Sequence, residues 1–165
     1  MTAPTLRPAR VDDLPTLLAL LIDDDLGWQR EAPTGGADRT VPADYRDAYD
    51  AIAADPRNEL VVAERDGEVV AMMQLTYIPS LSRLGAERMQ IEAVRVRSDL
   101  RSQGVGRQMI EWALERARQR GCRLAQLTSD KRREAAHRFY LRLGFKSTHE
   151  GMKLVLTPGP GEGTG

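Results

Sequence analysis

Residues 91–121 read IEAVRVRSDLRSQGVGRQMIEWALERARQRG, and this stretch decides how the chain folds. Its first part belongs to the segment Met89–Val96, whose apolar and β-branched residues predict a strand. A short polar turn leads to Gly104, and the residues up to Arg120 predict a long helix that ends at Gly121, a favoured helix C-cap residue. We therefore expect a strand that runs through a glycine loop into a helix.

The glycine loop has the features of an anion site. The first backbone N–H groups of a helix lack partners within the helix, and the positive end of the helix dipole lies beside them. Gly104 and Gly106 let the backbone approach a ligand closely, while Arg101 and Arg107 add positive charge. A dinucleotide loop would need glycine where Met109 stands, and a nucleotide P-loop would need Gly-Lys followed by Ser or Thr. A purely structural helix cap is the alternative for a GxG pair taken alone.

The remaining pattern predicts an α/β fold. Upstream of the decisive stretch we expect a strand, two helices and a hairpin around Asp66-Gly67, at Leu6–Pro8, Val11–Ile22, Pro42–Asp55, Leu60–Glu64 and Val69–Tyr77. After a loop at Pro79–Ala86 and the decisive stretch, we expect a strand, a helix and two closing strands, at Arg123–Thr128, Arg133–Leu143, Phe145–Thr148 and Met152–Leu156. Strand, helix and strand in this order favour a parallel crossover, and hence a mixed sheet.

The length of 165 residues fits a single domain, which we place at residues 1–156. The tail at residues 157–165 consists mostly of Pro, Gly and Thr and is expected to be mobile. No run is long and apolar enough to span a bilayer, and no signal peptide is visible, so the expected location is cytoplasmic and no membrane partner is expected. Cys122, the single cysteine, excludes an internal disulfide and a cysteine-based metal cluster.

The charge of the chain is zero overall but unevenly distributed. Residues 1–60 hold six Arg and twelve Asp or Glu, a net charge of −6, and the remainder carries +6. A neutral total argues against binding to nucleic acid, which requires a strongly basic surface. The acidic first part favours a cationic acceptor such as an amine, although a solvated acidic surface without a role is the alternative.

Two motifs resemble those of the GNAT N-acetyltransferase superfamily. Arg101–Gly106 matches its RxxGxG signature, and residues 136–145, AHRFYLRLGF, resemble its second block, AxxFYxxxGF. The likeness extends over nearly the whole chain in the order of the elements. It implies a largely antiparallel mixed sheet of six to seven strands, with a splayed parallel central pair, flanked by about four helices.

The resemblance also implies an activity, the transfer of an acetyl group from acetyl-CoA to a primary amine by direct attack in a ternary complex. By this likeness, backbone groups of Val94 and Val96 pair with the pantetheine arm of the coenzyme, and no metal is needed. The pyrophosphate is held by N–H groups of six consecutive residues, Ser102, Gln103, Gly104, Val105, Gly106 and Arg107. Many members carry Asn where this chain has Arg133, which is a candidate partner for a coenzyme phosphate instead.

Two residues are the catalytic candidates. The resemblance implies that Tyr140 is the acid that protonates the leaving thiolate, whereas an aromatic core residue beside Phe139 is the structural alternative. Glu92 is the candidate base, because a charged residue in an apolar strand must be solvated, paired or functional. Its alternative is an ion pair with Arg88 or Arg95. Regular strand alternation puts four side chains on one face, those of Gln90, Glu92, Val94 and Val96.

The acceptor is the least readable part of the site. By family analogy its cleft is built by the first helices and by the loops at residues 27–40 and 79–86. The sequence leaves open whether the acceptor is a small molecule or a protein, which acyl chain is preferred, and whether the chain forms a homodimer. A non-catalytic sensor of acyl-CoA and a plain interaction domain that binds only a sulfate-like anion are the competing functions.

Overall fold

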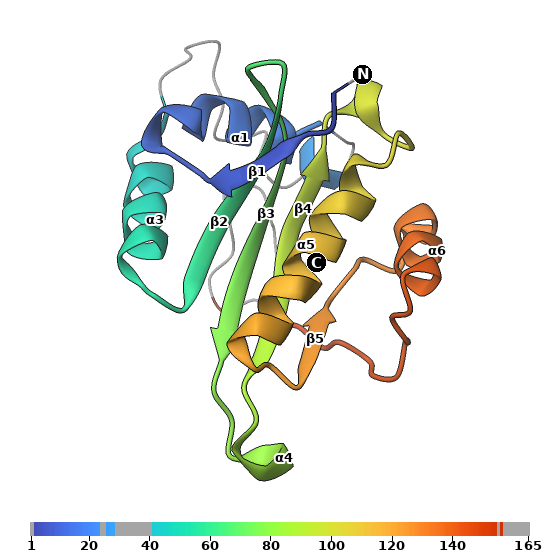
Figure 1. The fold of residues 1–165 in the computed structure, drawn as a ribbon. Coiled ribbons are helices and arrows are strands. Elements are labelled where there is room, and N and C mark those ends of the chain that lie inside the picture. Colours follow the sequence, from blue (N-terminus) through green and yellow to red (C-terminus); the bar gives the residue numbers. More distant parts are fainter. Residues whose placement is uncertain (1, 24–25, 29–40, 155, 157–165) are drawn as a thin grey trace.

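One mixed β-sheet is the centre of the computed structural model, which describes residues 2–23, 26–28, 41–154 and 156 (Figure 1). The described residues form five strands in sequence order across the sheet: β1 (Thr5–Pro8), β2 (Asn58–Arg65), β3 (Glu68–Ile78), β4 (Arg88–Val96) and β5 (Leu124–Leu127). Neighbours among β1 to β4 are antiparallel, and β4 pairs with β5 in parallel. The predicted α/β class and the mixed sheet are confirmed.

The two faces of the sheet are covered by different helices. Four helices of at least eight residues are described: α1 (Leu14–Leu21), α3 (Ala43–Ala54), α5 (Val105–Arg120) and α6 (Glu134–Arg142). Buried residues of α5 join the larger core cluster with β2, β3 and β4, whereas those of α1 join a second cluster with Val62 and Met72. None of the described helices is long and apolar enough to cross a bilayer.

The described residues also form three short helical segments, namely η1 (Val11–Asp13), α4 (Ser82–Gly85) and η3 (Ser98–Leu100), and residues 26–28 are helical as well. Segment α4 lies at the tip of the β3–β4 connection and projects beyond the end of the sheet (Figure 1). The sequence predicts only a loop there. Leu81 and Leu84 at this tip are almost fully exposed.

The hairpin between β2 and β3 forms where Asp66-Gly67 predicts it. Both turn residues have positive φ, 52° for Asp66 and 82° for Gly67. A two-residue turn with this geometry matches the twist of the adjoining strands, and Asp and Gly tolerate it at low cost. Local sequence therefore accounts for this part of the sheet.

The two closing strands predicted at residues 145–148 and 152–156 are not formed among the described residues of this region. Met152, Leu154 and Leu156 are exposed instead of packed on the sheet. A strand depends on hydrogen bonds to a neighbouring strand, which local β-propensity cannot supply. The described sheet thus has five strands rather than six or seven.

A β-bulge interrupts β4 beside the residues that form the candidate functional site. Met72 pairs with Arg95 and Gln74 pairs with Glu92, so the register between β3 and β4 shifts at this point. Ala93 has a φ of 49°, in the left-handed region that non-glycine residues seldom adopt. An extra residue of this kind reverses the alternation of side chains beyond it.

The bulge overturns the expected sharing of one face by Glu92, Val94 and Val96. Both valines pack against the cluster under α5, to which Ile91 also belongs. Glu92 follows Ile91 directly, so its side chain points to the opposite face, the one that α1 covers, together with Gln90. The regular alternation assumed from the sequence fails because the bulge inserts one residue.

Candidate functional site

Strands β4 and β5, the last pair of the described sheet, separate part-way along β4. Their pairing runs from Arg88 opposite Leu124 to Ile91 opposite Leu127, and β4 then continues to Val96 with no partner on that side among the described strands. The splayed parallel pair is therefore present, but at the edge of the described sheet rather than at its predicted central position. Its free edge carries the backbone of Val94 and Val96, whose role in holding pantetheine stays a prediction.

One group on this free edge is already engaged. The Nη1 atom of Arg95 donates to the carbonyl oxygen of Val94 at 2.9 Å. A backbone carbonyl has two lone pairs, so one further hydrogen bond to Val94 remains feasible. The guanidinium of Arg95 thus lies beside the opening between the strands.

The loop before α5 has the backbone form that an anion site requires. Gly104 (φ 87°) and Ser102 (φ 63°) are both in the left-handed region. The first bond within the helix runs from the N–H of Gln108 to the carbonyl of Gly104 at 3.0 Å, and no side chain caps the helix start. The N–H groups of residues 105–107 precede that bond and are directed out of the helix end. Their contact with pyrophosphate, like that of Ser102 to Gly104, stays a prediction.

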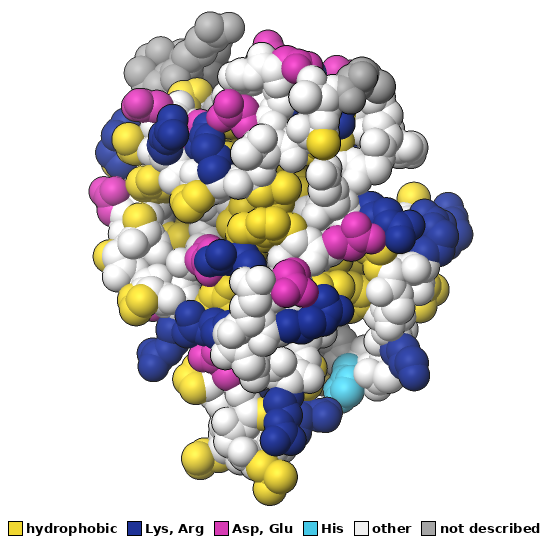
Figure 2. All heavy atoms as spheres, viewed as in Figure 1, with side chains coloured by type: hydrophobic (Ala, Val, Ile, Leu, Met, Phe, Trp, Pro, Cys, Tyr) yellow, Lys and Arg dark blue, Asp and Glu magenta, His cyan; other side chains and the backbone are white. Residues whose placement is uncertain are grey.

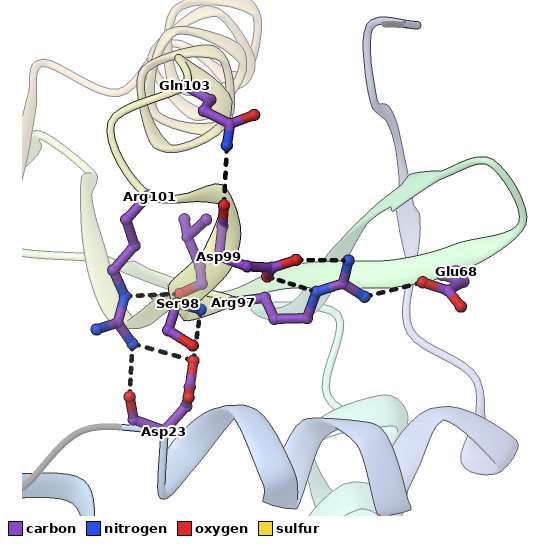
Figure 3. Close-up of polar contacts among 8 residues, drawn as sticks. Asp23, Glu68, Arg97, Ser98, Asp99, Arg101 and Gln103 are labelled. Atoms are coloured by element: carbon purple, nitrogen blue, oxygen red, sulfur yellow. Dashed lines mark hydrogen bonds and ion pairs between the residues drawn. The ribbon is translucent and has the colours of Figure 1, made fainter.

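Arg101 and Arg107 have partners of their own in this structure. The side chain of Arg101 runs from the loop to Asp23, at the end of α1, rather than towards the start of α5 (Figure 3). Arg107 pairs with Glu111 one turn further along the same helix, at 2.7 Å and well exposed. Asp23 was not identified as part of the site from the sequence, because it lies far from the loop and shows no motif.

Tyr140 lies on α6 within an aromatic group. Its ring centre is 5.0 Å from that of Phe139 and 5.7 Å from that of Phe145, and the ring packs against the cluster under α5. Burial raises the pKa of Tyr140, and the nearby charges of Arg95 and Arg133 oppose this shift without cancelling it. The hydroxyl is therefore protonated at neutral pH and can act as a donor.

Glu92 is exposed on the other face of the sheet, opposite Gln74 of β3. The ion pairs between described residues do not include the carboxylate of Glu92. The proton-accepting role of Glu92 stays a prediction. Because Tyr140 and Glu92 lie on opposite faces, the opening beside β4 separates them.

Parts of the expected acceptor region lie outside the described residues, namely residues 29–40 of the loop that follows the first helix. The predicted mobile tail at residues 157–165 lies outside them as well. Within the described residues, no group of three or more His, Cys, Asp or Glu side chains could hold a metal ion.

The acetyltransferase (GNAT) family matches residues 25–145, which is more than half of the chain and includes β4, the loop and α6. The chain belongs to the GNAT acetyltransferase family. This GNAT protein is an acyl-CoA-dependent N-acetyltransferase, in agreement with both sequence motifs.

Three relatives illustrate the likeness. The GNAT protein is 33% identical over 150 residues to the aminoalkylphosphonate N-acetyltransferase of Salmonella typhimurium, across 87% of this chain and 86% of that protein. It is 44% identical, with a TM-score of 0.87, to a crystal structure of a transcriptional regulator from Bacillus halodurans, across 93% of this chain and 99% of the other. A predicted acetyltransferase from Clostridium acetobutylicum, solved with acetyl-CoA, shares the fold at 18% identity and a TM-score of 0.67, across 93% and 96% of the two chains.

Proposed function

We propose that this GNAT protein transfers an acetyl group from acetyl-CoA to the primary amine of a small molecule, by direct attack within a ternary complex. The observation that carries the proposal is the arrangement around the free edge of β4. Tyr140 lies on the α5 side of this edge and Glu92 on the α1 side. A nucleophile and a leaving group occupy different positions around a tetrahedral carbon, so a base and an acid on opposite faces suit this reaction.

Glu92 and Tyr140 each carry out one of the two proton transfers of the reaction. The amine attacks the thioester carbonyl and forms a C–N bond, and Glu92 accepts the proton that the nitrogen then loses, directly or through water. The C–S bond breaks, and Tyr140 donates its hydroxyl proton to the departing sulfur. Solvent returns that proton to Tyr140 and removes the one on Glu92, so the products are an amide and free coenzyme A.

The surface around the loop and α6 supports the binding of an anionic coenzyme. Basic side chains gather over α6 and the residues before it (Figure 2), and the exposed ones are Lys131, Arg132, Arg138 and Arg142. On the other side of the loop, an open hollow of about 500 Å³ begins at Gly104 and is lined by Arg65 and Arg107 among others. Several of these cations pair with exposed carboxylates, among them Arg107 with Glu111, and a ligand with several phosphate groups would compete for them at the helix start.

The relative from Salmonella suggests where to look for the acceptor. We propose that the acceptors are small amines that carry an anionic group, with aminoalkylphosphonates as the first candidates. The reason is that the Salmonella relative, 33% identical over most of both chains, is an aminoalkylphosphonate N-acetyltransferase. The acidic first part of the chain favours the ammonium end of such a molecule. A second copy of the chain remains a partner to be tested by the mass of the protein in solution.

The test is the release of free thiol at saturating acetyl-CoA with a panel of amines, including aminoalkylphosphonates, polyamines and a peptide with a free N-terminus. Amine-dependent release, and an amide product of the expected mass, support the proposal. The alternative is a non-catalytic acyl-CoA sensor. The Bacillus relative is described as a transcriptional regulator, which is the reason for testing this alternative. Tight binding of acetyl-CoA without thiol release for any amine would favour that alternative.

A further inference from the structure

Asp23 connects the end of α1 to the loop before α5. Its backbone carbonyl accepts a hydrogen bond from Nη2 of Arg101 at 2.6 Å. Its carboxylate accepts from the same nitrogen at 3.1 Å and from the backbone N–H of Ser98 at 2.6 Å (Figure 3). The Nε atom of Arg101 donates to the carbonyl of Val96, the last residue of β4, at 3.0 Å. One guanidinium therefore joins α1, β4 and the loop.

Three features of these contacts indicate a role in shape rather than in charge. Two of the three acceptors of Arg101 are backbone carbonyls, so its bonds fix the course of the chain. The third acceptor is the carboxylate of Asp23, which offsets the charge that a phosphate would otherwise attract. The side chain of Arg101 also extends away from Gln103 and the start of α5 (Figure 3).

The loop needs such support because its backbone is strained. Ser102, the residue after Arg101, has a φ of 63° although it is not glycine. A non-glycine residue in this region is disfavoured by about 1 to 2 kcal/mol, and it persists only where surrounding contacts hold it. The η3 turn that precedes it spans only three residues. Leu100 of this turn packs against the larger core cluster, and the bonds of Arg101 to Asp23 and Val96 tie the residue next to Ser102 to α1 and β4.

We propose that Arg101 is a positioning residue that acts through Asp23. The pair holds the loop so that the N–H groups ahead of α5 face the coenzyme pyrophosphate, and Arg101 itself does not bind phosphate. This inference rests on the proposed use of acetyl-CoA. It also ties the coenzyme loop to α1, which packs on the face of the sheet where Glu92 lies.

The experiment compares Asp23→Ala, Arg101→Ala and the double variant in the full chain. Dissociation constants for coenzyme A are measured by calorimetry, and KM for acetyl-CoA and kcat with an active amine. Positioning predicts that each single variant weakens coenzyme A binding about tenfold and raises KM similarly, with kcat at saturation within about twofold of the parent. It further predicts that the double variant loses less affinity than the sum of the two single losses, because both changes break the bond between the Arg101 guanidinium and the Asp23 carboxylate.

Direct phosphate binding by Arg101 predicts the opposite response at Asp23. Removal of that carboxylate would free the guanidinium, so coenzyme A would bind as well as before or better, and this result would overturn the proposal. Arg101→Lys separates the two roles again, because Lys keeps the charge but lacks the planar fork that reaches Val96 and Asp23 together. Positioning predicts that Arg101→Lys binds nearly as weakly as Arg101→Ala, whereas a charge-based role predicts that most of the affinity returns.

Arg97→Ala is the matched control. Arg97 lies in the same turn but pairs only with the exposed side chains of Asp99 and Glu68, and none of its contacts reaches α1 (Figure 3). Exposed pairs of this kind contribute little, so coenzyme A affinity should stay within about twofold of the parent. If Asp23→Ala lowers the melting temperature, its affinity for coenzyme A is measured well below its unfolding transition, where the affinity must still be reduced. If the parent itself binds no coenzyme A, the proposed function fails and not only the role of this pair.

Discussion

A Cβ atom placed on Gly106 would lie 3.6 Å from the ring of Phe139, so the two sequence motifs of the chain meet at this point. The same atom would lie 3.6 Å from the side chain of Val96. The start of α5 thus packs closely on the end of β4 and on α6. Any side chain larger than a methyl group at Gly106 must push these three elements apart.

Gly106→Val is expected to weaken coenzyme A binding at least tenfold while the protein still folds. Its extra methyl groups would displace the helix start from β4 and α6, and overpacking of this kind costs about 1 to 3 kcal/mol. Gly106→Ala is the control, because contacts of 3.6 Å are ordinary and helical Ala is favoured over Gly by about 0.5 to 1 kcal/mol. Calorimetry and thermal unfolding report both effects. Unchanged affinity in Gly106→Val would contradict the predicted pyrophosphate site.

Tyr140→Phe is expected to bind acetyl-CoA like the parent and to lose about 10²- to 10⁴-fold in kcat, since it removes only the proton donor. The raised pKa of Tyr140 keeps the hydroxyl protonated, so the acid should not limit kcat below the ordinary tyrosine pKa of about 10. The measurement is kcat from pH 6 to 10 under conditions where the chemical step limits the rate. Equal turnover in parent and variant would reduce Tyr140 to a packing residue.

Glu92→Gln is expected to lower turnover most at low pH, where the acceptor amine is mostly protonated and needs a base. Coenzyme A affinity should not change, because Glu92 lies on the face of the sheet opposite Val94 and Val96. Glu115→Gln is the control, an exposed carboxylate on α5 that pairs only with its own helix. A similar pH profile for Glu92→Gln and Glu115→Gln would rule out a role in proton transfer.

Tyr77 is expected to make folding stability fall in alkaline solution. Its side chain is 2% exposed, and burial, together with a 2.8 Å hydrogen bond to Glu59, raises its pKa to about 12. The unfolded chain releases this proton near pH 10, so the contribution of Tyr77 is complete below about pH 10 and is lost as the pH rises to about 12. The loss is at most about 3 kcal/mol, from a shift of about two pKa units. Urea unfolding at pH 8, 10 and 11 should show a smaller decline in Tyr77→Phe than in the parent.

Local sequence was sufficient for most of the elements and for the family. Asp66-Gly67 predicts the hairpin because these residues adopt positive φ at low cost, and both do so in the structure. Gly104 and Gly121 mark the two ends of α5 for the same reason, each with positive φ. Such features depend on the backbone preferences of a few adjacent residues, which a sequence displays directly.

The arrangement of the candidate site depended on contacts between distant segments. The bulge at Ala93 exists because β3 and β4 pair out of step, and it sends Glu92 to the opposite face from the one expected. Arg101 donates to Asp23 at the end of another helix, and no local sequence pattern predicts this contact. The closing strands at 145–148 and 152–156 had the expected composition but are absent from the described residues, since strand hydrogen bonds come from a neighbour. The sequence by itself thus determined the elements and the two motifs, whereas strand register and long-range pairing, which depend on the packed sheet, decided where the functional side chains point.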